Sequence, residues 1–244
     1  MNDRLTRIRE NEKISHTAAY TNEKLYDKTS WLQKPIKTVL DILPLFHAYT
    51  ELHVLDLGCG IGRNSICIAE TYQNINCTID CVDLLEIALE KLKQNAKEYG
   101  VSENISEILK PIEEYEIRSN FYDLIMAVSA LEHIDSEKSF VRKLTEIRNG
   151  VRENGIVCLV INSNVRETNA ATKEIMEPQF EVNLPTERLQ LLLEDTFSGW
   201  RVLKTSVTAQ EYDIPRDKII SHLDTNVVTY VAQRDAHKNP ISNK

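Results

Sequence analysis

Residues 54–65 read VLDLGCGIGRNS, an apolar run that leads directly into three closely spaced glycines. The residues from His53 to Leu57 are typical of a buried strand, and those from about Asn64 to Tyr72 predict a helix. Glycine at a strand-to-helix turn permits positive φ and lets a ligand approach the backbone closely. Because open α/β sheets bind ligands beyond the carboxyl ends of their strands, this turn is the first candidate for a ligand site.

The spacing of the glycines separates the possible ligand classes. A dinucleotide fold carries G-x-G-x-x-G, whereas Gly58, Gly60 and Gly62 follow G-x-G-x-G, and Arg63 stands where the third dinucleotide glycine would be. This spacing opposes a nicotinamide-dependent oxidoreductase. No Walker lysine follows, which argues against binding of a nucleoside triphosphate. Asp56 precedes the first glycine by two positions, so the full motif is D-x-G-x-G.

From about residue 36 onward, segments with helical periodicity alternate with strand-like segments, which predicts a parallel sheet with crossover helices. The expected strands are His53–Leu57, Thr78–Val82, Ser106–Leu109, Tyr122–Val128 and Ile156–Asn162, the last preceded by a turn at Asn154-Gly155. The expected helices follow Pro35, Arg63, Asp83, Ser136 and Pro185. Two long β-rich stretches, Trp200–Tyr212 and Asn226–Gln233, finish the chain. Residues 163–184 are expected to be a loop, and loops of that length are usually functional or mobile.

Composition sets limits on function. The chain has 244 residues, of which 42% are hydrophobic, enough for one domain with a sizeable core. The formal net charge of -8 argues against binding to a phosphate backbone, so no nucleic acid partner is expected. No apolar run reaches the roughly 18 residues of a membrane span, and the N-terminus lacks the apolar core of a secretion signal. The five scattered cysteines favour a reduced, cytoplasmic location.

The motif D-x-G-x-G after a first strand closely resembles motif I of the class I S-adenosylmethionine-dependent methyltransferases. The resemblance continues through Asp83 after the second strand, Lys110–Glu113 after the third, Tyr122–Ile134 around the fourth and Arg152–Gly155 before the fifth. It implies S-adenosylmethionine as cofactor and an α/β fold. That fold is doubly wound and Rossmann-like, with seven mostly parallel strands, a terminal antiparallel β-hairpin and helices on both faces.

The resemblance covers roughly residues 35–234, which we expect to form the methyltransferase domain. Residues 1–34 are expected to be a helical or flexible cap segment, and residues 235–244 a polar tail. The cap segment carries Tyr20, Tyr26 and Trp31, which would either close over the site as a lid or pack a first helix on the sheet edge.

The resemblance also implies a set of cofactor-binding residues. They are Asp56, Gly58, Cys59, Gly60, Ile61, Gly62, Asn64, Asp83, Leu84, Pro111, Ile112 and Val128. The backbone of the glycine loop would face the methionine part of the cofactor, with Asp56 orienting the loop and Val128 near the carboxylate end. Asp83 would hold the ribose, and Leu84 and Ile112 would lie beside the adenine. The alternatives are a helix cap for Asp83 and a purely structural carboxylate for Asp56.

Methyl transfer is an in-line displacement, so the protein must chiefly align the reactants, and it needs a base only if the acceptor arrives protonated. His133 and Glu132 are the candidate bases, with structural turn roles as the alternative, and Asn162 and Asn164 could bind polar groups of the acceptor. No metal ligand set accompanies them.

Resemblances within the family suggest the acceptor. D-L-G-C-G-x-G-R-N-S and the later F-x-G-W-x-V weakly resemble the tellurite-resistance methyltransferases, which methylate soft nucleophiles. Leu131–Ile134 instead resembles a broad set that includes quinone-biosynthesis enzymes. The expected function is therefore methylation of a small molecule, either a soft nucleophile (thiol, selenite, tellurite) or a quinone-like metabolite. The alternatives are a non-catalytic S-adenosylmethionine-binding regulatory module and a nucleic-acid or protein methyltransferase.

Overall fold

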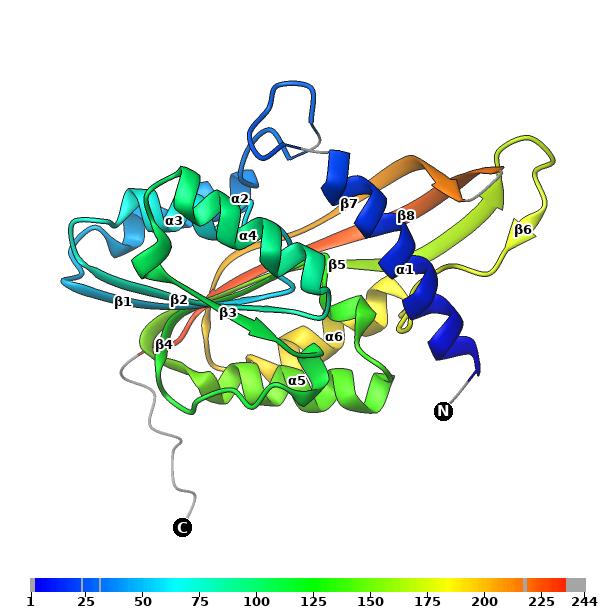
Figure 1. Cartoon of the computed structure of the whole chain (residues 1–244). Coiled ribbons are helices and arrows are strands. Elements are labelled where there is room, and N and C mark those ends of the chain that lie inside the picture. The colour runs from blue at the N-terminus through cyan, green and yellow to red at the C-terminus, as the bar shows by residue number, and fades with distance from the viewer. Residues whose placement is uncertain (1–2, 23, 31, 217–218, 236–244) are drawn as a thin grey trace, which may run out of the picture.

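The computed structural model describes residues 3–22, 24–30, 32–216 and 219–235 (Figure 1). The helices are α1 Asp3–Asn22, α2 Lys37–Ile42, α3 Ser65–Thr71, α4 Glu86–Glu98, α5 Glu137–Gly150 and α6 Thr186–Thr196. The strands are β1 Glu51–Leu57, β2 Asn76–Asp83, β3 Ile105–Leu109, β4 Tyr122–Val128, β5 Val151–Asn169, β6 Ile175–Met176, β7 Arg201–Arg216 and β8 Ile219–Gln233. None of the helices in these ranges is long and apolar enough to cross a membrane.

The strands form one mixed sheet in the order β3-β2-β1-β4-β5-β8-β7, and the short β6 pairs with β5. Strands β1 to β5 are parallel, whereas β8 pairs antiparallel with both β5 and β7. This confirms the predicted seven-stranded, mostly parallel sheet with antiparallel strands at its end. The strand order reverses between β1 and β4, so the carboxyl ends of these two strands flank the point where such sheets bind ligands.

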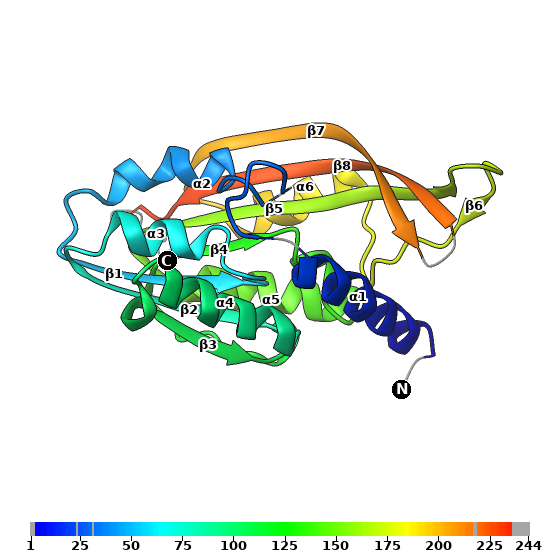
Figure 2. The same ribbon diagram turned by 45° about the horizontal axis from the view of Figure 1, so that its top comes forward.

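Helices cover both faces of the sheet, as predicted (Figure 2). One apolar core lies under α2, α3 and α4, and a second lies under α5 and α6. The middle residues of β4 are buried on both faces, which explains why Leu124–Val128 reads as a continuous apolar run. Helix α5 begins where the sequence predicts, because the Ser136 side chain accepts a hydrogen bond from the Ser139 N–H at 3.2 Å.

Strand β5 differs from its prediction at both ends. The expected turn before it is a bulge inside it: Tyr122 pairs with Val151 and Leu124 with Ile156, so residues 152–155 loop out. At the other end the loop expected from residue 163 begins only after Asn169, because β5 continues to pair with β8 beyond the parallel sheet. Val165 and Glu167 alternate inward along this extension and are buried, which the apolar-run criterion could not detect.

Helix α1 lies beside the carboxyl-end edge of the parallel strands in both views, and Figure 2 shows it below the β5–β8 extension (Figures 1 and 2). Its sequence is strongly polar, and Ile8 and Tyr20 are its buried hydrophobic residues in the described part of the chain. A helix with so little apolar surface is held mainly by polar contacts. Those contacts make α1 part of the candidate site.

Candidate functional site

A cavity of about 700 Å³, part of it open to solvent, lies at the carboxyl ends of β1, β2 and β4 under α1. Six of the residues predicted for the site line it, namely Gly58, Asp83, Leu84, Pro111, Ile112 and His133. The rest of the wall is formed by Arg9, Glu12, His16, Tyr20, Leu85, Glu113, Ser129, Ala130 and Glu181.

The glycine loop reaches the cavity at Gly58 and has a backbone conformation that favours glycine. Gly58, Gly60 and Gly62 all have positive φ, at 75°, 53° and 90°. A Cβ atom on Gly58 would lie only 2.3 Å from the Cβ of Ala130, which follows β4. Glycine is therefore required at position 58 for two reasons, the backbone conformation and the close approach of the segment after β4.

Asp83, at the end of β2, holds the glycine loop in place. Its Oδ2 accepts the Gly60 N–H at 2.9 Å, and its Oδ1 accepts the Leu85 N–H at 2.9 Å, directly before α4. Burial raises the pKa of Asp83, and the hydrogen bonds from the backbone N–H groups oppose that rise. The helix cap that the sequence offered as an alternative role for Asp83 is wrong, because Leu85 is the N-cap residue of α4 and no side chain caps this helix; Asp83 accepts the N–H of that cap residue.

The remaining predicted cofactor residues lie behind the cavity wall. Asp56 is buried and accepts a hydrogen bond from the Ser65 hydroxyl at 2.5 Å, and burial raises its pKa to about 7. Asn64 accepts the Ile36 N–H at 3.1 Å through Oδ1. The side chains of Cys59 and Ile61 are buried in the core. These residues shape the loop from behind, and Val128 likewise is not among the lining residues.

The adjacent Glu132 and His133 point in different directions from a 3₁₀ turn at Leu131–His133. The Glu132 side chain is buried away from the cavity and accepts hydrogen bonds from the Asn162 N–H, at 3.1 Å, and from its side-chain amide. Its second oxygen, Oε2, has no hydrogen-bond partner among the described residues, and burial raises the pKa of this carboxyl. Asn162 is thereby tied to Glu132, and of this adjacent pair His133 alone lines the cavity.

His133 is held as a cation. Burial lowers its pKa, but the hydrogen bond with Glu181 and the charges of Glu12 and Glu132 outweigh that effect and raise the pKa to about 9. The Nδ1 atom lies 3.0 Å from Oε2 of Glu181, and the ring stacks on Phe180 with centroids 5.1 Å apart. At neutral pH the ring is therefore protonated, and an imidazolium cannot accept a proton as a general base.

This protonation makes the fold sensitive to alkaline pH. The pKa of His133 is 6.5 in an unfolded chain and about 9 in the fold, so its stabilisation is complete below pH 6.5 and is lost as the pH rises through about 9. This pKa shift contributes at most roughly 3 kcal/mol to the free energy of unfolding. Urea unfolding at about pH 6 and pH 9.5 should show a smaller alkaline loss in His133→Gln than in the wild type. If both proteins lose the same stability between about pH 6 and pH 9.5, the raised pKa of His133 would be contradicted.

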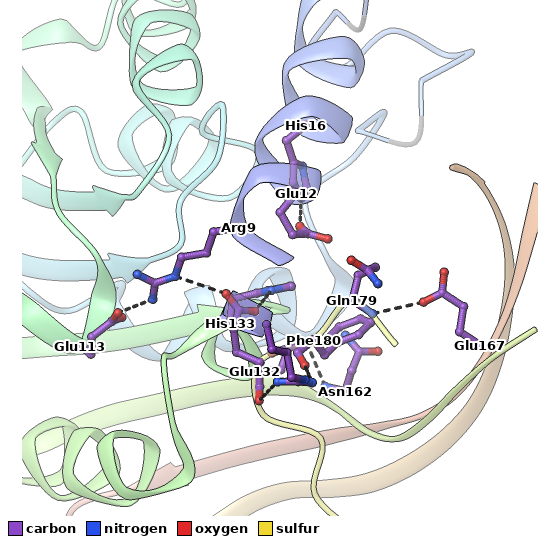
Figure 3. A network of polar contacts seen from close by, with 12 residues as sticks. Arg9, Glu12, His16, Glu113, Glu132, His133, Asn162, Glu167, Gln179 and Phe180 are labelled. Atoms are coloured by element: carbon purple, nitrogen blue, oxygen red, sulfur yellow. Dashed lines mark hydrogen bonds and ion pairs between the residues drawn. The ribbon is translucent and has the colours of Figure 1, made fainter. Parts of the chain in front are cut away.

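Helix α1 is fastened over the cavity by ion pairs and hydrogen bonds (Figure 3). Arg9 pairs with Glu113 on the far side of the cavity and, through Nε at 3.5 Å, with Oε1 of Glu181. Arg4 pairs with Glu177 at 2.6 Å and donates a hydrogen bond to the Phe180 carbonyl at 2.9 Å. The segment from Glu177 to Glu181 and the helix thus form one polar seam.

Further along α1, Glu12 completes the polar face. Its carboxylate lies 2.9 Å from Nε2 of His16 and 3.7 Å from Arg216 of β7. Burial raises the pKa of Glu12, but the hydrogen bond with His16 and the nearby cations reverse this and leave the pKa lowered. Sequence periodicity missed all of these residues because α1 has no apolar stripe. Its unusual density of charge was the available signal.

The three aromatic residues proposed for a lid have different positions. Tyr20 is buried and lines the cavity, and a Cβ atom on Gly60 would lie 3.0 Å from its hydroxyl. Tyr26 lies outside the cavity lining and donates a hydrogen bond to the Arg63 carbonyl at 2.8 Å. Trp31 lies outside the described residues. Asn164, proposed as an acceptor ligand, is exposed and hydrogen-bonds through its backbone to Leu184.

Comparisons with known proteins agree with this architecture. The family model of the methyltransferase domain matches residues 54–155. A malonyl-[acyl-carrier protein] O-methyltransferase of Ilyobacter polytropus is 28% identical over 115 residues, which are 47% of this chain and 42% of that protein. The chain therefore matches less than half the length of this curated relative.

Two solved structures show the same fold at low identity. TehB from Haemophilus influenzae has a TM-score of 0.57 and 18% identity over 80% of this chain and 62% of its own. A Burkholderia thailandensis 1,6-didemethyltoxoflavin-N1-methyltransferase, solved with S-adenosylhomocysteine, has a TM-score of 0.56 and 15% identity over 94% of this chain and 90% of its own. The residues that match the methyltransferase-domain model, 54–155, include the glycine loop at the switch point of the sheet, so this part of the chain is similar to a methyltransferase domain.

Proposed function

We propose that the cavity under α1 binds S-adenosylmethionine and that the protein transfers its methyl group to a small molecule. The observation that carries the proposal is the glycine loop, held by Asp83 and opening into a cavity at the switch point of the sheet. The solved relative with bound S-adenosylhomocysteine supports the choice of cofactor.

Different residues of the cavity would contact the ribose, the adenine and the methionine part of this cofactor. Each oxygen of Asp83 already accepts one N–H and has further lone pairs, so the carboxylate can also accept the ribose hydroxyls. Leu84, Pro111 and Ile112 offer an apolar wall beside it for the adenine. The methionine part would then lie along Gly58, with its methyl group directed toward the side of the cavity that holds His133.

A small acceptor is favoured because α1 roofs that side of the cavity. A macromolecular substrate would have to displace the seam between α1 and residues 177–181, whereas a small molecule can react beneath it. The residues needed at this end are those that align the acceptor and exclude water, since the departing thioether is neutral. His133 is already protonated, so the proposal favours acceptors that arrive deprotonated, among them the soft nucleophiles and quinone-like metabolites predicted from sequence.

Cofactor binding should stabilise the protein. A ligand at 100 times its dissociation constant adds about 2.7 kcal/mol to the free energy of unfolding. Thermal unfolding with S-adenosylmethionine or S-adenosylhomocysteine should therefore raise the midpoint by several degrees, and NAD should leave it unchanged. A rise with NAD and none with the sulfonium cofactor would refute the proposal.

We also propose that residues 35–234 form the catalytic domain and that α1, in the segment before it, is its cap. A cytoplasmic location is supported by the five cysteines, all of which are free. Four of them are buried and serve as small apolar core residues.

A further inference from the structure

Glu181 joins the cap helix α1 to His133, which lines the cavity just after the end of β4. One oxygen, Oε2, lies 3.0 Å from Nδ1 of His133, and the other, Oε1, lies 3.5 Å from Nε of Arg9 on α1. The Glu181 side chain is only 2% exposed, so both contacts are shielded from water. A carboxylate shared in this way transmits the position of α1 to the His133 ring.

The backbone around Glu181 holds this contact rigidly. The N–H of Val182 donates to the carbonyl of Glu132 at 2.9 Å, so a hydrogen bond joins the residue after Glu181 to the residue before His133. Phe180, on the other side of Glu181, is buried and stacks on the imidazole. The ring is therefore fixed by its edge and by its face. With Nδ1 taken by Glu181, Nε2 is the nitrogen that remains for a molecule in the cavity.

We propose that Glu181 is a positioning residue that, with α1 closed, directs the Nε2–H of His133 at an oxyanion of the methyl acceptor. This rests on the proposed function and names its substrate class: a small molecule with a negatively charged oxygen next to the atom that takes the methyl group. In the transfer, a lone pair of that atom bonds to the methyl carbon while the S–CH₃ bond breaks and sulfur keeps the electron pair. His133 keeps its proton throughout and donates a hydrogen bond.

The charges around His133 set how this donor depends on pH. Glu12 faces it from α1, Glu181 from the segment before α6, and Glu132 from its own turn, all favouring the imidazolium. Arg9 and His16 on α1 line the same cavity. As the pH rises through about 9, the ring becomes neutral, and anion binding should weaken. A general base would behave in the opposite way, because it becomes active only when it loses its proton.

The test compares Glu181→Gln with Glu177→Gln in the full chain saturated with S-adenosylhomocysteine. Glu177 is a matched control, because it pairs with Arg4 and Arg7 of α1 from the same segment, and in the described part of the chain no hydrogen bond or ion pair joins it to His133. NMR titration of the imidazole should show the His133 pKa lower by at least about one unit in Glu181→Gln and unchanged in Glu177→Gln. An unchanged pKa in both variants overturns the proposal.

Benzoate and benzylamine then probe the acceptor class, because they share size and shape but differ in charge. Benzoate should bind the wild type, and Glu181→Gln should weaken it about twofold or more at pH 8 and much less at pH 6, where His133 is again protonated. Benzylamine binding more tightly than benzoate, or equal benzoate affinity in the wild type and Glu181→Gln at pH 8, overturns the proposal. Failure of S-adenosylmethionine to bind would refute the proposed function separately, and the imidazole titration of the unliganded protein would still test Glu181.

Discussion

Gly58→Ala is expected to abolish cofactor binding and to destabilise the fold by about 2–5 kcal/mol. An L-residue at positive φ costs roughly 1–2 kcal/mol, and overpacking a buried site typically adds 1–3 kcal/mol. Both apply here, because Gly58 has a φ of 75° and its new Cβ would meet the Cβ of Ala130 at 2.3 Å. The measurements are urea unfolding and calorimetric titration with S-adenosylhomocysteine.

Two further variants separate the backbone strain from the collision. Gly100 also has a positive φ, of 70°, but its Cβ would meet no atom within 4 Å, so Gly100→Ala should lose only the strain part and keep cofactor affinity. In the double variant Gly58→Ala with Ala130→Gly the colliding atom is removed, and most of the additional destabilisation should disappear. Equal losses in Gly58→Ala and Gly100→Ala would mean that the close approach to Ala130 does not matter.

Strand β4 of the parallel sheet was predictable because its local sequence carries the signal. Strand β4 is buried on both faces in its middle, and the sequence shows this as the apolar run Leu124–Val128; the structure reproduces the predicted bounds Tyr122–Val128. The start of α5 at Ser136 was equally local, since a cap depends on one side chain and the next turn. In both cases, the sequence pattern that predicts the element lies within the element itself.

Elements that depend on distant partners were not predictable in this way. The extension of β5 past Ser163 exists because β8 pairs with it, and the buried Glu167 there is stabilised by Ser221 and Arg216. Charged residues at buried positions hide the alternation that predicts a strand. Helix α1 is a similar case, because its partners are carboxylates and carbonyls more than 100 residues away.

In the candidate site too, the features set by local sequence were predictable and those set by distant partners were not. The glycine spacing and Asp83 were accessible because one strand, one turn and one helix position them. The surroundings of His133 were not, because Glu181 and Phe180 lie about 50 residues further on, in a segment with no periodic pattern. Sequence reasoning therefore offered His133 as a base, whereas the charges that the fold assembles around it raise its pKa to about 9.

Asp83→Ala is expected to weaken the binding of S-adenosylhomocysteine by at least tenfold. A hydrogen bond to a charged group contributes about 1.5–3 kcal/mol, and a factor of ten corresponds to about 1.4 kcal/mol. The carboxylate acts twice, because it would bind the ribose and it also holds Gly60 at 2.9 Å, without which the loop loses its shape. Stability should fall as well, by about 1–3 kcal/mol, since the N–H groups of Gly60 and Leu85 lose their acceptor.

Asp80→Asn is the matched control for Asp83→Ala, because Asp80 lies on the same strand but pairs with Arg118 and does not line the cavity. It should keep its cofactor affinity. Asp83→Asn tests the charge by itself, since the amide oxygen can still accept one of the two backbone N–H groups. Its stability should therefore lie between those of the wild type and Asp83→Ala, while its affinity for the cofactor falls through the lost charge. Calorimetric titration that finds the same affinity in Asp83→Ala as in Asp80→Asn would remove Asp83 from the cofactor site and leave it a structural support of the glycine loop.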